Sequence, residues 1–162
     1  MQIPRRRIQY AFLTGVLFIL FSAPLYPQTA DKLEALLEKP ELSWSETADF
    51  ILEASDIGVF SSTEGAFRFA EGLKWLPKKA GPGDIARLNG VALLLMRSFD
   101  LKGGIFYSLA KSPHHAYREL IYKGYIRGST DPDMTVSGRE LLLIVNRILA
   151  VKEKETEKAV KS

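Results

Sequence analysis

A short polar segment near the C-terminal end carries the side chains best suited to bind a charged ligand. Ser137 and Glu140 are three residues apart and precede an apolar run, the spacing of a capping box at a helix N-terminus. Backbone N–H groups and the helix dipole favour anions there. We therefore predict that Ser137 and Glu140 cap this helix. The alternative is a ligand-binding site for an anion, formed by Lys123, Arg127, Ser137, Arg139 and Glu140.

Patterns for catalysis or metal binding are weak. His114 and His115 are adjacent, so on a helix their side chains point about 100° apart and cannot easily hold one ion together. A small secreted enzyme using them with Glu119 is a remote alternative. The loop from Asp131 to Asp133 lacks the glycine and glutamate of a calcium loop, and we expect an Asx-type turn at Asp131 instead. We predict a non-enzymatic protein with no catalytic residue, metal or cofactor.

The N-terminal segment has the pattern of an export signal. Arg5–Arg7 form a basic region, and an apolar run follows from Ala11 to Phe21 before small residues and a proline. We predict that residues 1–28 are a signal peptide and that the protein is exported to the bacterial periplasm or cell envelope. The alternative is an uncleaved membrane anchor, because Ile8–Tyr26 contains no charged residue.

The charge and cysteine content exclude several classes of protein. Arg5–Arg7 account for the whole net charge of +3, so the rest of the chain is neutral overall and nucleic acid is not an expected partner. The chain has no cysteine, which excludes disulfides, thiolate metal sites and a lipid-anchored lipoprotein. Membrane contact is expected only if the N-terminal segment is retained.

An internal repeat organises the rest of the chain. Ala66–Phe99 aligns without a gap with Ala116–Leu149, at an offset of 50 residues. The alignment pairs Arg97 with Arg147 near the ends of two apolar segments. We expect both arginines to bind the last carbonyl groups of their helices. A repeat of this length indicates that one supersecondary unit is used twice.

The predicted fold is all-α, with two tandem helix-turn-helix units of about 50 residues after the signal segment. The units span about 44–99 and 105–149 within a helical domain at 29–151. Residues 152–162 are expected to be a charged tail that extends the last helix into solvent. Oligomerisation is also expected, because two repeats leave an apolar face incomplete.

Capping and breaker residues set the expected helix ends. Ser43 and Glu46 form a capping box, and Ser112 before Pro113 is typical of a helix start. Asp84 is expected to cap a helix that continues to Phe99. The helix before it is expected to start near Thr63 and end at about residue 75, ahead of a loop rich in glycine and proline.

The second unit resembles an S-layer homology repeat. The resemblance is carried by Gly124-Tyr125-Ile126-Arg127-Gly128, by Asp131-Pro132-Asp133, by Ser137–Glu140 and by the apolar segment that contains Arg147. We call Ser137–Glu140 the tetrad, after the Thr-Arg-Ala-Glu-like tetrad of the family. Here its arginine stands one place later than in the family pattern.

The resemblance implies a partner as well as a fold. Proteins of this family use three repeats around a pseudo-threefold axis, whereas two are evident in this sequence. Their tetrad arginine and its neighbours hold pyruvylated cell-wall polysaccharide. The partner implied for this chain is therefore a cell-envelope polysaccharide, and the alternative is another envelope protein.

Overall fold

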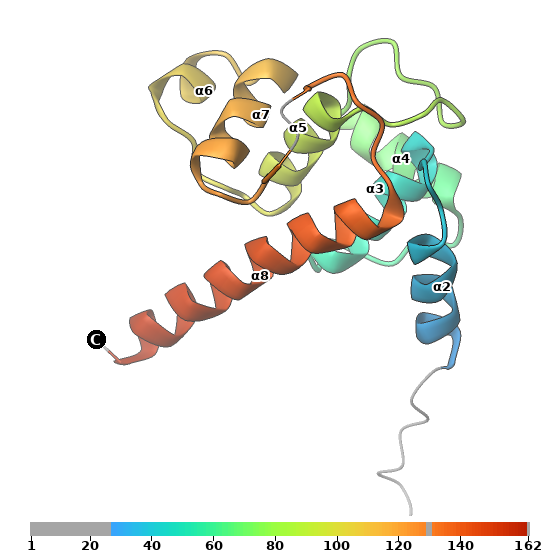
Figure 1. Ribbon diagram of the computed structural model, residues 1–162, viewed down its shortest axis with the longest axis horizontal. Coiled ribbons are helices and arrows are strands. Elements are labelled where there is room, and N and C mark those ends of the chain that lie inside the picture. The colour runs from blue at the N-terminus through green and yellow to red at the C-terminus, as the bar shows by residue number, and fades with distance from the viewer. Residues whose placement is uncertain (1–26, 129–130, 162) are drawn as a thin grey trace, which may run out of the picture. The chain divides into compact units, whose positions relative to one another are not determined.

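The computed structural model describes residues 27–128 and 131–161, and its regular structure is helical (Figure 1). The all-α prediction is confirmed: within these ranges β structure is limited to isolated bridges. The predicted signal lies outside the described residues except for its last two. The chain divides into two compact units, residues 1–33 and 34–162. None of the described helices combines the length and apolarity that crossing a membrane requires.

Seven helices are described in these ranges. They are α2 (Pro27–Leu37), α3 (Trp44–Ala54), α4 (Thr63–Gly72), α5 (Leu88–Ser98), α6 (Ile105–Leu109), α7 (Pro113–Tyr122) and α8 (Gly138–Lys161). Helix α2 begins in the first unit and ends in the second. Helices α4 and α7 begin and end at residues that the 50-residue alignment pairs with each other. The first residues of α5 and α8 are also paired by this alignment.

Local capping explains where several helices begin. The Ser43 backbone N–H donates to a Glu46 carboxylate oxygen at 3.0 Å, and Ser43 Oγ accepts from the Glu46 N–H at 3.3 Å, so the predicted capping box of α3 is confirmed. Ser112 caps α7 ahead of Pro113, also as predicted. The cap predicted at Asp84 is wrong. Its carboxylate accepts from the Gly81 N–H at 2.7 Å, and α5 begins only at Leu88.

Helix α4 is shorter than predicted and ends at Gly72 instead of near residue 75. Lys74 has a positive φ of 59°, in the left-handed region. The Trp75 N–H then donates back to the Ala70 carbonyl oxygen at 3.0 Å, a closing bond of the Schellman type. Glycine normally provides this conformation, so the absence of glycine at position 74 hides the helix end from sequence analysis.

Within the compact unit of residues 34–162, backbone hydrogen bonds join the starts of three helices. The Leu42 N–H donates to the Val136 carbonyl oxygen at 3.1 Å, and the Ala86 N–H donates to the Leu42 carbonyl oxygen at 2.8 Å. A further bond of 3.0 Å runs from the Leu88 N–H to the Met134 carbonyl oxygen. We call the segments around Leu42, Ala86 and Val136 the hub. All three of these side chains are fully buried.

The hub fixes the N-termini of α3, α5 and α8 close to one another, because each helix begins two residues after a hub side chain. The two units predicted from the sequence do not include Leu42. Leu42 nevertheless has the same position relative to α3 that Ala86 has relative to α5 and Val136 has relative to α8.

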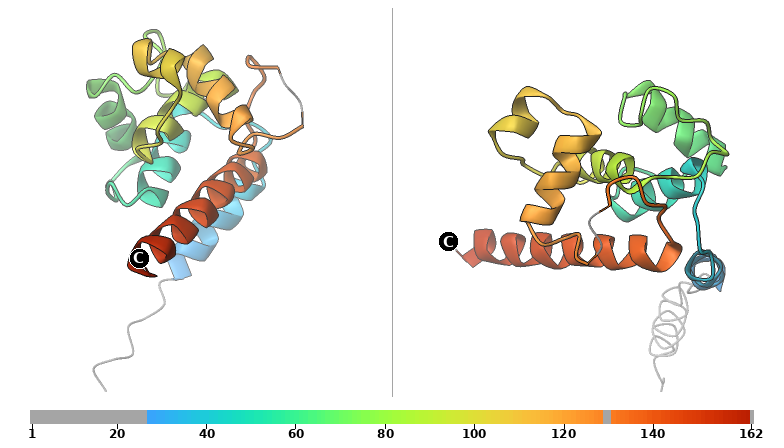
Figure 2. Two further views of the ribbon diagram at one scale, coloured as in Figure 1. Left: turned by 90° about the vertical axis from the view of Figure 1, so that its left-hand side faces the viewer. Right: turned by 45° about the horizontal axis from the view of Figure 1, so that its top comes forward.

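Helix α5 lies at the centre of this arrangement. Nine of its eleven residues are buried, and it packs against α3 and α7. Helix α8 runs along one side of these helices (Figures 1 and 2) and buries one face, formed by Leu141, Ile144, Val145 and Ile148. It continues through the predicted tail to Lys161. At the start of that tail Lys152 Nζ donates to the Phe99 carbonyl oxygen at 2.9 Å.

Candidate functional site

A hollow of about 210 Å³ lies at the N-terminal part of α8. We call it the tetrad hollow. Four of the five predicted site residues, Arg127, Ser137, Arg139 and Glu140, line it together with Ile126, Leu143, Ile144 and Arg147. The structure therefore brings most of the predicted residues to one place. The exception is Lys123, the exposed C-cap of α7, which does not line the hollow.

Three arginines from different parts of the chain line the tetrad hollow. Arg127 follows the α7 turn, and its Nε donates to the Gly124 carbonyl oxygen at 2.9 Å. Arg147 lies within α8, and its Nη1 donates to the Tyr125 carbonyl oxygen at 2.8 Å. Arg139 is exposed in the first turn of α8. The bonds to backbone hold Arg127 and Arg147 in place, and each guanidinium keeps further N–H groups to donate.

Glu140 is the acidic group in the hollow. Its backbone N–H donates to Ser137 Oγ at 3.2 Å, which is one half of the predicted capping box. Burial raises the pKa of Glu140, and a hydrogen bond from the Ser137 backbone lowers it only in part. With three arginines against one carboxylate and the positive end of α8, the hollow favours an anion.

Gly138 explains why the arginine of the tetrad is its third residue and not its second. Its α-carbon packs against the backbone carbonyl of Leu36, and a Cβ at this position would overlap that oxygen. No side chain fits at position 138, so the first residue of α8 that can carry an arginine is Arg139. The aligned position in α5, Leu88, is fully buried.

Arg147 is the lining residue whose role the sequence analysis missed. The helix-end role expected for it is wrong, because α8 continues to Lys161 and Arg147 donates to Tyr125 outside the helix. Arg97 does lie in the last turn of α5, as expected, but its buried Nε has no hydrogen-bond partner. The recurrence of arginine at the 50-residue offset is a signal for both residues, but it does not identify their partners.

The remaining candidates do not form a second site around the tetrad. His115 Nδ1 lies 2.9 Å from Ser112 Oγ and 3.0 Å from the Ala110 carbonyl oxygen, which gives that ring a local structural role. Neither His114 nor His115 lines the tetrad hollow. The Asx turn is confirmed, because the Asp133 N–H donates to Asp131 Oδ1 at 2.9 Å.

No group of three or more metal-ligating side chains occurs among residues 27–128 and 131–161. Comparison with protein-family models, curated proteins and solved structures gave no match to this chain.

Proposed function

We propose that this protein is an exported, non-enzymatic binding module of the bacterial envelope. It is built from repeats similar to S-layer homology repeats, and it binds the acidic groups of a cell-wall polysaccharide in the tetrad hollow. The observation that carries the proposal is that Arg127, Arg139 and Arg147 all line the tetrad hollow. Guanidinium groups bind carboxylates through two parallel hydrogen bonds, which gives both strength and orientation.

The repeated helix pattern supports the proposed architecture. Two helix pairs, α4 with α5 and α7 with α8, share the same 50-residue spacing. The hub adds a third helix start, that of α3. Three equivalent helix starts around shared backbone bonds are what a three-unit repeat requires. We infer that α3, with the segment before it, takes the place of a further repeat ahead of the pairs α4 with α5 and α7 with α8.

Export is tested by the mass of the processed protein. We expect the intact mass to correspond to a chain cut between Ala23 and Ala30, without the segment before the cut. A mass that includes this segment would favour the alternative, in which the N-terminal segment anchors the module to the membrane facing the periplasm.

Binding is tested by co-sedimentation of the purified protein with cell-wall fractions. We expect enrichment on intact walls, and loss of enrichment when the wall carboxyl groups are amidated. Arg139→Ala should reduce the bound fraction, whereas Arg68→Ala on the exposed face of α4 should not. Equal sedimentation of the parent and Arg139→Ala would remove the glycan proposal.

A second candidate function, protein interaction through self-association, is favoured by one observation. Three apolar residues of helix α6 have exposed fractions of 76–80%: Ile105, Phe106 and Leu109. Exposed apolar clusters of this kind mark interaction sites. Sedimentation velocity should then show a dimer that Phe106→Ser with Leu109→Ser converts to a monomer. A monomer for the parent protein at all concentrations would contradict this candidate.

A further inference from the structure

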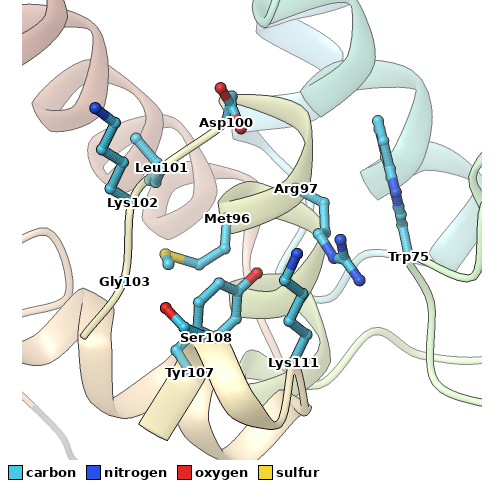
Figure 3. Close-up of a pocket in the computed structure, with 10 residues that line it drawn as sticks. All are labelled: Trp75, Met96, Arg97, Asp100, Leu101, Lys102, Gly103, Tyr107, Ser108 and Lys111. Atoms are coloured by element: carbon cyan, nitrogen blue, oxygen red, sulfur yellow. The ribbon is translucent and has the colours of Figure 1, made fainter. Parts of the chain in front are cut away.

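A second cavity, of about 520 Å³, lies at the C-terminal end of α5 (Figure 3) and shares no lining residue with the tetrad hollow. Side chains from the end of α5, from α6 and from the loop after α4 line it. Trp75 and Met96 provide apolar wall, and Arg97, Tyr107 and Lys111 bring polar groups. A cavity of this size matches those that hold small organic ligands.

Two polar atoms in this cavity are buried without a partner. The Tyr107 side chain is 4% exposed, and its hydroxyl makes no hydrogen bond. Arg97 Nε is also buried without an acceptor. Buried polar atoms are nearly always hydrogen-bonded in folded proteins, so two donors facing one cavity indicate an acceptor that binds there. Burial raises the pKa of Tyr107, which keeps the hydroxyl protonated as a donor.

Arg97 differs in its hydrogen bonding from the arginine at the equivalent position of the repeat. Arg147 occupies the equivalent place in α8 and donates to the carbonyl oxygen of Tyr125. The residue equivalent to Tyr125 is Trp75, yet Arg97 makes no such bond to it. Both residues line the cavity instead. The arginine that one unit uses to hold its turn is left available to a ligand in the other.

The charges around the cavity select an anion. Figure 3 shows the Arg97 and Lys111 side chains reaching into the cavity, with Trp75 beyond Arg97. Neither cation forms an ion pair within the part of the chain that the structure describes. Lys102 adds a third positive charge to the lining and Asp100 a single negative one. Asp100 also disfavours a ligand of high negative charge, because like charges repel in a partly buried site.

We propose that this cavity binds a small organic carboxylate. The carboxylate lies between Arg97 and Lys111 and accepts a hydrogen bond from the Tyr107 hydroxyl group. The apolar body of the ligand packs on Trp75 and Met96. This site is independent of the tetrad hollow, and either can exist without the other.

The test titrates benzoate into the purified protein and follows the Arg97 Nε–H signal by NMR. We expect saturable shifts with a Kd of about 1 mM. Benzyl alcohol, which has the same ring without the charge, should give no saturable shift. Inorganic phosphate, which has charge without an apolar body, should bind at least about tenfold more weakly. The absence of a saturable benzoate shift, or equal binding of phosphate, would overturn the proposal.

Variants separate the cavity from general effects of charge. Arg97→Met and Tyr107→Phe keep the shape of the lining and should weaken benzoate binding by at least about tenfold and about threefold, respectively. Arg68→Met removes an exposed arginine of α4 and should leave the Kd unchanged. The Trp75 indole N–H provides the signal for the Arg97 variant. Unchanged binding in Arg97→Met would contradict the assigned contacts.

Discussion

The α-carbon of Gly138 packs against the carbonyl oxygen of Leu36, and this contact fixes where the N-terminus of α8 lies. The Gly138 N–H also donates to the Lys39 carbonyl oxygen at 3.0 Å. The close approach leaves no space for a side chain. The position of the tetrad arginine is therefore set by packing at the start of the helix.

Gly138→Ala should destabilise the protein by about 1–3 kcal/mol, because the new methyl group must push the Leu36 backbone away. Gly72→Ala is the matched control. An added Cβ there meets nothing within 4 Å, and alanine is the better helix former, so we expect stabilisation by up to about 1 kcal/mol. Urea unfolding measures both changes. Equal effects of the two substitutions would contradict the close contact at Gly138.

Arg147→Met should cost about 1–2 kcal/mol, because it removes the hydrogen bond that holds the Tyr125 carbonyl group. Arg97→Met should leave stability unchanged or raise it, because the buried Nε of Arg97 has no partner to lose. The measurement that checks both predictions is the free energy of unfolding of each variant, compared with that of the parent protein. If both variants lose the same stability, the two arginines share one role, as their alignment predicts.

The contrast between these arginines shows how far sequence reasoning reaches. The caps at Ser43 and Ser112 depend on neighbours within three residues, so their residue types predict them. The partner of Arg147 lies 22 residues away in the chain, and no local pattern identifies it.

Long-range packing hides parts of the fold from sequence analysis in the same way. Leu42 joins the hub through bonds to Ala86 and Val136, distant segments that only the folded chain brings together. The tetrad residues were predictable because they are consecutive. Arg127 was predictable because it follows a recognisable glycine turn. Lys123 is close to Arg127 in sequence, but it caps α7 instead of lining the hollow.

Tyr107→Phe should stabilise the ligand-free protein by about 1 kcal/mol, because it removes a buried hydroxyl that has no partner. Tyr122→Phe is the control, since Tyr122 is 88% exposed and should be neutral. Thermal unfolding in buffer without carboxylates gives the comparison. A loss of stability in Tyr107→Phe would mean that its hydroxyl already has a partner.

Glu46 and Glu140 hold the same place in their helices but should respond to pH in opposite directions. Burial tends to raise the pKa of Glu46, but hydrogen bonds from Lys39 and Ser43 outweigh it and lower the pKa below 4.5. Glu46 therefore stabilises the fold above pH 4.5, and this contribution is lost as the pH falls through its folded pKa. Glu46→Gln should cost about 1 kcal/mol at pH 7 and reduce the loss of stability in acid.

Because the pKa of Glu140 is raised, its contribution to stability changes with pH in the opposite direction. Its contribution to stability is fully present below pH 4.5 and is lost as the pH rises through the folded pKa, because the native state holds the proton more tightly. Glu140→Gln should therefore raise stability at pH 7. Urea unfolding from pH 3 to pH 8 measures both variants, and parallel pH profiles for the two would be inconsistent with their different surroundings.

The central claim, that the tetrad hollow binds acidic wall polysaccharide, is tested most directly by calorimetric titration of the purified protein with soluble acidic polysaccharide fragments. Arg127→Gln with Arg139→Gln should weaken binding by at least about tenfold, because each charge-assisted hydrogen bond contributes about 1.5–3 kcal/mol. Arg68→Gln should stay within about twofold of the parent. Identical affinity of the double variant and the parent would contradict the claim.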